Sequence, residues 1–97
     1  MTPAKISASD VLHNPAAHRY EVSIGGQLAL ADYRVEQDRV VMTHTFVPPD
    51  LRGRGIAEVL VRVALEDVRR HGQRVVPQCS YVARFIAQHP AYQDLLA

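Results

Sequence analysis

The sequence has no tryptophan and a single cysteine, Cys79, among its 97 residues. One cysteine excludes a disulfide within the chain and a metal site built from several thiolates. The 11 Lys and Arg nearly cancel the 10 Asp and Glu, so no overall field would draw the chain to nucleic acid or to an anionic membrane. No apolar run approaches the length that crosses a bilayer. Any anion that the protein recognises must therefore be bound by a local structure.

The stretch from Met1 to Ser9 also lacks the apolar segment and small-residue cleavage site of a signal peptide. We therefore expect a cytoplasmic protein in which Cys79 stays reduced. An apolar share of 47% argues against disorder, and the sequence has no repeat, low-complexity tract or linker. We expect residues 1–97 to form one domain, and we expect no metal site, because the histidines lack metal-ligand spacing.

The first half of the chain alternates polar and apolar residues, which predicts β-strands. We expect strands over residues 19–24, 27–35 and 39–47, with Gly25-Gly26 and Gln37-Asp38 as turns and Pro48-Pro49 ending the third strand. Residues 6–13 fit either a short strand or a helical turn, and the sequence leaves both open.

The second half changes to helical spacing, with apolar residues on one side from Ile56 to His71 and Gly72 placed to cap the helix end. Val75-Val76 is expected to form a short buried strand. Ser80 is expected to cap a helix over residues 81–88, and residues 92–96 to add a further turn. The predicted fold class is therefore α+β, around one mixed, mostly antiparallel sheet.

The turn Arg52-Gly53-Arg54-Gly55-Ile56-Ala57 joins the third predicted strand to the long helix. A helix start offers backbone N–H groups without intrahelical partners, and glycine lets that backbone approach a phosphate closely. The two arginines can add charge-assisted hydrogen bonds to phosphate oxygens. These features suit a pyrophosphate, although such a turn can also be a plain connector. The spacing fits neither a P-loop nor a dinucleotide fingerprint.

Here the chain resembles a known family. Arg52-x-x-Gly55-x-Ala57, after a strand and opening a helix, is similar to the acyl-CoA signature of the GNAT superfamily of N-acetyltransferases. The small single-domain GNAT-like proteins are also similar in three further blocks: His44-Thr45-x-Val47-Pro48, Val76-Pro77-x-Cys79-x-Tyr81-Val82 and His89-Pro90-x-Tyr92. The resemblance runs from about Arg19 to Leu95.

The resemblance implies a shortened GNAT-like fold, with a long helix after the pyrophosphate loop, a C-terminal helix, and N-terminal helices reduced or missing. It also implies that acetyl-CoA (coenzyme A) is a substrate, with its pantetheine arm lying in a gap of the sheet. Backbone groups of Phe46 and Val47 would bind the pantetheine amides. The residues expected to contact the cofactor are Phe46, Val47, Arg52, Gly53, Arg54, Gly55, Ile56, Ala57, Cys79 and Ser80.

Three residues are candidates for catalysis. Cys79 lies just before a predicted helix N-terminus, which favours the thiolate, although most free cysteines are simply small buried side chains. An acyl group could pass through Cys79, or the thiol could only line the pocket. His44 is a candidate general base, on an amine or for Cys79, with a structural histidine as the alternative. Tyr81 is considered as the acid that protonates the CoA thiolate, with packing as the alternative; Ser80 is a helix cap or a weaker proton relay.

We therefore expect an acetyltransferase that moves acetyl from acetyl-CoA to an unidentified amine, for which a monomer suffices. The alternative is a non-catalytic acyl-CoA-binding sensor or interaction module, because so short a chain has little room for an acceptor pocket. Nucleic-acid binding through the scattered arginines is disfavoured by the low net charge and the absence of tryptophan.

Overall fold

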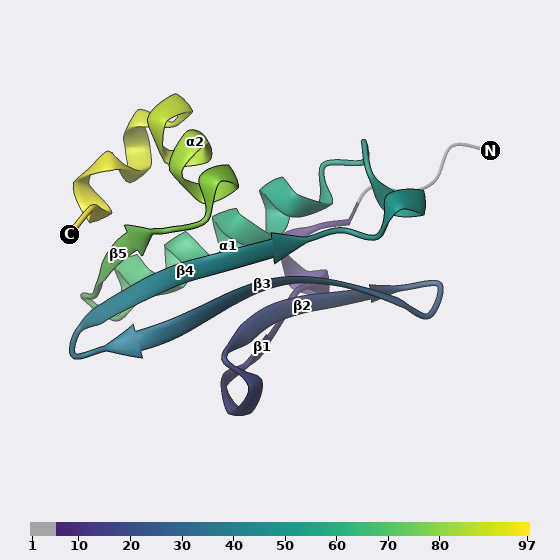
Figure 1. The fold of residues 1–97 in the computed structure, drawn as a ribbon, viewed down its shortest axis with the longest axis horizontal. Coiled ribbons are helices and arrows are strands. Elements are labelled where there is room, and N and C mark those ends of the chain that lie inside the picture. The colour runs from purple at the N-terminus through teal and green to yellow at the C-terminus, as the bar shows by residue number, and fades with distance from the viewer. Residues whose placement is uncertain (1–5) are drawn as a thin grey trace.

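The alternating first half of the chain folds as consecutive antiparallel strands in the computed structural model, which describes residues 6–97 (Figure 1). The strands are β1 (Leu12–Asn14), β2 (Arg19–Ile24), β3 (Gln27–Glu36), β4 (Arg39–Phe46) and β5 (Arg74–Pro77). They lie in sequence order, and only the β4–β5 pair is parallel. This confirms the mixed, mostly antiparallel sheet. Residues 6–13 contain both predicted alternatives, because a 3₁₀ turn at Ala8–Asp10 precedes β1.

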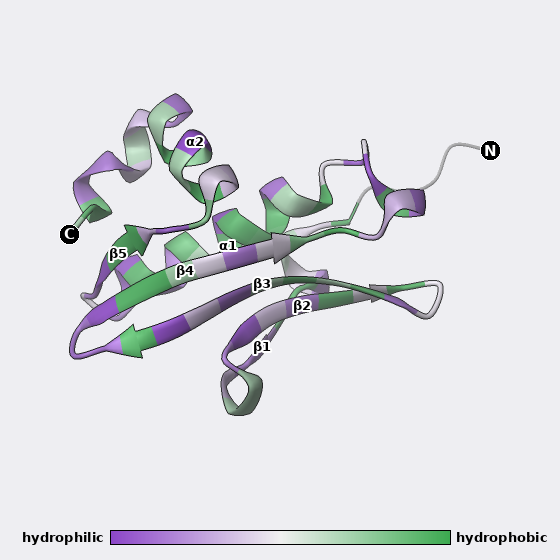
Figure 2. Cartoon of the chain, in the orientation of Figure 1, coloured by the Kyte–Doolittle hydropathy of each residue, from purple (hydrophilic) through white to green (hydrophobic). Residues whose placement is uncertain are grey.

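The long helix α1 (Ile56–Arg70) crosses one face of the sheet. Hydrophobic and hydrophilic residues alternate along its ribbon in Figure 2, and the apolar ones are buried against the strands: Ile56, Leu60, Val61, Ala64, Leu65 and Val68. Gly72 ends the helix as predicted, at φ 65°, with its N–H donating to the Arg69 carbonyl and the Gln73 N–H donating to the Val68 carbonyl. No helix among residues 6–97 is long and apolar enough to cross a membrane.

The C-terminal segment packs against α1 beside the β5 edge (Figure 1). It consists of α2 (Ser80–Gln88) and a 3₁₀ helix at Pro90–Leu95. The Tyr92 hydroxyl donates to Glu66 at 2.7 Å, and Arg69 pairs with Asp94 at 2.8 Å, so polar contacts as well as apolar ones join this segment to α1. Leu96 then forms a bridge with Val75, which extends the sheet past β5.

The prediction that Ser80 caps the last helix is wrong. Ser80 is the first helical residue, and Cys79 stands at the cap position in an extended conformation. The peptide N–H of Cys79 donates to the Met42 carbonyl of β4 at 2.9 Å. That bond holds Cys79 to the sheet and moves the helix start one residue earlier than the serine suggests.

A β-bulge interrupts the pairing of β3 with β4. Tyr33 lies opposite Met42 and Asp32 opposite His44, so Thr43 has no partner in the register. Because directly paired residues share a face of the sheet, Thr45 lies on the same face as the buried Ala31, while His44 lies on the face of Asp32. The bulge therefore places Thr45, rather than His44, on the inner face.

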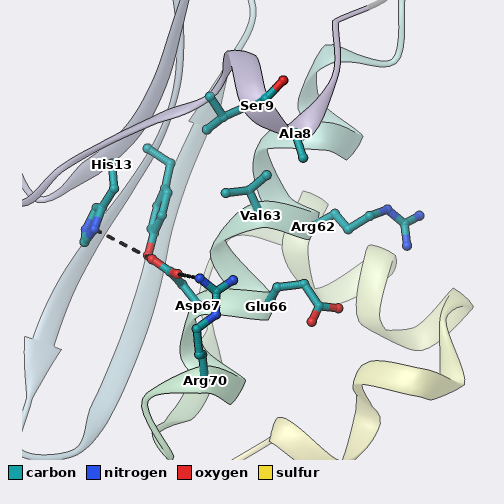
Figure 3. A pocket seen from close by; sticks show the side chains of 10 residues that line it. Ala8, Ser9, His13, Arg62, Val63, Glu66, Asp67 and Arg70 are labelled. Carbon is teal, nitrogen blue, oxygen red and sulfur yellow. Dashed lines mark hydrogen bonds and ion pairs between the residues drawn. The ribbon is translucent and has the colours of Figure 1, made fainter.

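A polar cluster ties the N-terminal strands to α1. The Tyr20 hydroxyl donates to the Asp67 carboxylate at 2.7 Å, and the His13 ring stacks on Tyr20 with centroids 4.3 Å apart. Figure 3 shows His13 and Arg70 approaching Asp67 from two sides, at 3.7 and 3.4 Å. Burial, together with the hydrogen bond to Asp67, raises the pKa of Tyr20, so its hydroxyl remains a donor at neutral pH.

We expect Tyr20→Phe to lower the free energy of unfolding by about 1–2 kcal/mol, because the half-buried Asp67 carboxylate loses its shortest hydrogen bond. Urea denaturation followed by circular dichroism measures this. Tyr81→Phe is the matched control, since the Tyr81 hydroxyl forms no hydrogen bond with residues 6–97, and we expect a change below about 0.5 kcal/mol. Equal losses in the two variants would contradict a special role for the Tyr20–Asp67 bond.

Candidate functional site

The turn between β4 and α1 holds its backbone in conformations that glycine adopts most easily. A 3₁₀ turn at Pro49–Leu51 follows the proline corner, and the chain then passes through Gly53 at φ 82° and Gly55 at φ 74°. Gly55 is the cap residue of α1, and the first bond into the helix runs from the Val59 N–H to its carbonyl. Within residues 6–97, the backbone N–H groups of residues 53–58 donate to no protein acceptor. They are free to bind an anion at the positive end of the helix.

These groups border a cavity of about 380 Å³, called here the loop cavity, which lies between the turn and the start of α2. Its lining residues are Val47, Leu51, Arg52, Gly53, Gly55, Ile56, Ala57, Glu58 and Tyr81. Arg52 is fixed beside it, because its Nε donates to the Val47 carbonyl at 3.0 Å. Glu58 would repel an anion, but Arg62 pairs with it at 3.0 Å and offsets much of that charge.

The sheet opens next to the loop cavity. Pairing between β4 and β5 ends at Met42 and Pro77, while β4 itself continues to Phe46. The Cys79 N–H bond to the Met42 carbonyl is the final link, and beyond it the β5 side of β4 has no strand partner among the described residues. An extended ligand with amide groups could pair with β4 along this edge, as a strand would.

Cys79 lies at this opening with its thiol half-buried. The Thr45 hydroxyl is 3.5 Å from its Sγ. Burial by itself would raise the pKa of the Cys79 thiol, but hydrogen bonds from the Thr45 hydroxyl and from the backbone N–H groups of Val82, Tyr81 and Thr45 outweigh it, and the pKa lies below its ordinary value. A lowered pKa together with partial exposure is the environment of a reactive cysteine.

Tyr81 joins Cys79 to the loop cavity, because it lines that cavity and lies two residues further along the chain. Burial, and then the charge of Glu58, raises the pKa of its hydroxyl. The group therefore stays protonated at neutral pH and can donate a proton.

The structure brings together only some of the predicted site residues. Arg52, Gly53, Gly55, Ile56 and Ala57 line the loop cavity with Val47 and Tyr81, whereas Arg54 is half-buried outside it and Ser80 is exposed. His44 stacks on Phe46, with ring centroids 6.5 Å apart, on the face opposite to Thr45. Since Thr45 contacts Cys79, His44 and Cys79 lie on different sides of β4, and the predicted roles of His44 and Ser80 remain predictions.

Two residues of the site were missed in the sequence. Thr45 lies inside the block that carries the family resemblance, but only the bulge turns it toward Cys79. Glu58 is a helical surface residue by its spacing, and nothing in the sequence sets it beside Tyr81.

A larger cavity, of about 480 Å³, lies along the other flank of α1 above the Asp67 cluster (Figure 3). It shares no lining residue with the loop cavity. Its Tyr20, Asp67 and Arg70 already bond to one another, whereas the N–H groups of the loop are unpaired, so the loop cavity is the better candidate for an anionic ligand. No three acidic, histidine or cysteine side chains gather at metal-binding distance within residues 6–97.

The chain is similar to known proteins of one family. The model of the GCN5-related N-acetyl-transferase family matches residues 19–95. The chain is similar to Protein NATD1 of Bos taurus, with 33% identity over 88% of this chain and 78% of that protein, and to Protein NATD1 of Mus musculus, with 31% identity over 88% and 80%. The solution structure of a GCN5-like protein from Staphylococcus aureus superposes with a TM-score of 0.73 at 21% identity, covering 95% of this chain and 91% of the other, and it shares the fold.

We expect iodoacetamide to alkylate Cys79 with a pH midpoint below that of a free-cysteine peptide measured alongside, because the thiolate is the species that reacts and the pKa of Cys79 is lowered. Thr45→Val removes the hydroxyl beside the sulfur and should move the midpoint upward. Thr43→Val is the matched control, since the Thr43 hydroxyl donates to the Asp32 carbonyl, and its midpoint should stay at the wild-type value. A midpoint at or above the free-thiol value in the wild type would contradict the lowered pKa.

Proposed function

Since this chain belongs to the GCN5-related N-acetyltransferase family, we propose that it transfers an acetyl group from acetyl-CoA to an amine. The observation that carries the proposal is the set of unpaired N–H groups at residue 53 and residues 55–58, which belong to residues lining the loop cavity at the start of α1. A pyrophosphate bound there would accept several backbone hydrogen bonds and meet the positive end of the helix. The Arg52 guanidinium, held by Val47, adds a positive charge at the rim.

The open edge of β4 is the proposed site for the pantetheine arm. Backbone groups of Phe46 and Val47 would bond its amides, which sets the thioester beside the opening where Cys79 lies. Val47 already has its carbonyl bonded to Arg52, so its N–H is the group of that residue left for a ligand.

Two residues have chemistry suited to the transfer. The Cys79 thiolate can attack the thioester carbonyl and accept the acetyl group, and an amine can then attack the acetyl-Cys79 thioester, which forms the amide bond and breaks the bond to Sγ. Tyr81, protonated at neutral pH, can supply the proton that the departing CoA thiolate needs. In a direct attack of the amine on acetyl-CoA, Tyr81 keeps this role and Cys79 only lines the site.

His44 is proposed to act on the acceptor amine rather than on Cys79, because it lies on the other face of β4. Ser80, exposed beside Cys79, is proposed as a minor cofactor contact. One copy of the chain suffices for this site, and a cytoplasmic setting would keep its single cysteine reduced.

We expect saturating CoA to raise the melting temperature by roughly 10 °C or more, since a ligand at a hundred times its Kd adds about 2.7 kcal/mol. Gly55→Val should abolish the shift, because its side chain would enter the cavity and its φ is left-handed. Gly72→Val is the matched control, with a similar positive φ and similar open space at the other end of α1, so both variants lose about 1–2 kcal/mol of stability but only one loses binding. Equal binding by both would refute the loop site.

We expect Tyr81→Phe to slow acetyl transfer by about 100-fold or more, with the affinity for CoA retained, because only the proton donor is removed. Release of free CoA in the presence of a panel of amines measures the rate. Intact mass after incubation with acetyl-CoA separates the two routes: an acetyl adduct that Cys79→Ala abolishes indicates transfer through the thiol. Tight CoA binding without turnover by the wild type would instead favour a non-catalytic acyl-CoA-binding module.

A further inference from the structure

A small cavity adjoins the loop cavity along α2. It has a volume of about 120 Å³ and is lined by Glu58, Tyr81, Arg84, Phe85, Gln88 and His89. Glu58 and Tyr81 line both cavities, so a ligand with a pyrophosphate on the loop would meet this second space directly. The face of α2 that follows Tyr81 is therefore the surface along which the rest of such a ligand would lie.

Arg84 is the cation of this small cavity. The nearby arginines of α1 all have carboxylate partners: Arg62 with Glu58, Arg69 with Asp94 and Arg70 with Asp67. Arg84 is exposed and forms no ion pair or hydrogen bond with residues 6–97. Burial and the charge of Glu58 raise the pKa of the Tyr81 hydroxyl, and the charge of Arg84 lowers it. The guanidinium of Arg84 therefore lies close to Tyr81, which lines both cavities.

Aromatic rings form the wall beside Arg84. The Phe85 and His89 rings stack at 4.0 Å between centroids, and Tyr81 lies 6.5 Å from Phe85. His89 Nδ1 contacts the Phe85 carbonyl at 2.6 Å. Phe85 itself is buried, so the half-buried rings of Tyr81 and His89 are the ones that a nucleotide carrying a phosphate of its own could contact beside the unpaired guanidinium.

We propose that Arg84 binds the 3′-phosphate of the adenosine half of CoA, and so makes the protein distinguish CoA from 3′-dephospho-CoA. The inference rests on the proposed function, because it places CoA at the loop. Arg84 lies three residues, or about 4.5 Å along the helix axis, beyond Tyr81. With the pyrophosphate at the loop, this offset places Arg84 beside the ribose that adjoins the pyrophosphate. Arg62 holds the Glu58 carboxylate, so the carboxylate common to both cavities does not cancel the charge of Arg84.

The test compares the Kd of CoA with that of 3′-dephospho-CoA by isothermal titration calorimetry. The wild type should bind CoA about 3- to 10-fold more tightly, and Arg84→Gln should remove this preference while leaving the Kd of 3′-dephospho-CoA unchanged. Arg84→Lys keeps the charge and should retain part of the preference. The preference of the wild type should also shrink as salt is raised, because the contact is exposed.

Arg39→Gln is the matched control. Arg39 is also exposed and without a carboxylate partner among the described residues, but it begins β4, at the end of the strand away from the loop. It should keep the full preference for CoA. A preference that survives in Arg84→Gln, or an equal loss of affinity for both ligands, would overturn the proposal for Arg84 while leaving CoA binding intact. Failure of the wild type to bind either ligand would overturn the proposed function, and this inference with it.

Discussion

The hydrogen bond from the Cys79 N–H to the Met42 carbonyl fixes the point at which β4 and the chain after β5 separate. On one side of it the two strands pair in parallel, and on the other β4 continues alone to Phe46. The same bond sets the first residue of α2 and holds the Cys79 sulfur near the Thr45 hydroxyl. The opening of the sheet, the place of the half-buried Cys79 thiol and the position of Tyr81 all depend on this one contact.

Helix α1 contributes both to the core and to the candidate site, through different parts of its length. Its apolar stripe fills the core beneath the sheet, and its first turn leaves N–H groups unpaired beside the loop cavity. Arg62 contacts both the site and the C-terminal segment. It pairs with Glu58 at the loop cavity, and its guanidinium lies over the rings of Phe85 and Tyr92, at 5.4 and 5.9 Å from their centroids. A single side chain therefore offsets a charge at the site and helps hold the C-terminal segment in place.

Most of the fold could be predicted from the sequence because its signals are local. The strand period, the Gly25-Gly26 turn, the proline corner and the glycine after α1 all act through neighbouring residues. The loop could also be predicted, since the spacing of Gly53 and Gly55 next to a helix start has a direct physical meaning. The bulge at Thr43 could not be predicted, because it depends on how β3 and β4 pair. The sequence therefore could not show whether His44 or Thr45 lies on the inner face of the sheet. The position of Cys79 as the cap of α2 could not be predicted for a similar reason. A hydrogen bond to β4, rather than a side-chain preference, determines where the helix begins.

The residues after the last 3₁₀ helix affect how one molecule can associate with another through the edges of the sheet. Leu96 bridges to Val75 and the Ala97 N–H donates to the Val75 carbonyl at 3.0 Å, so the outer margin of β5 is already occupied. At the opposite margin, β1 has only three residues and runs into Pro15, which has no N–H to donate. Within residues 6–97 neither margin offers a long row of unpaired peptide groups. Apart from the short stretches of β4 beyond Met42 and of β2 beyond Glu21, the sheet is therefore protected against growing, strand by strand, into an aggregate.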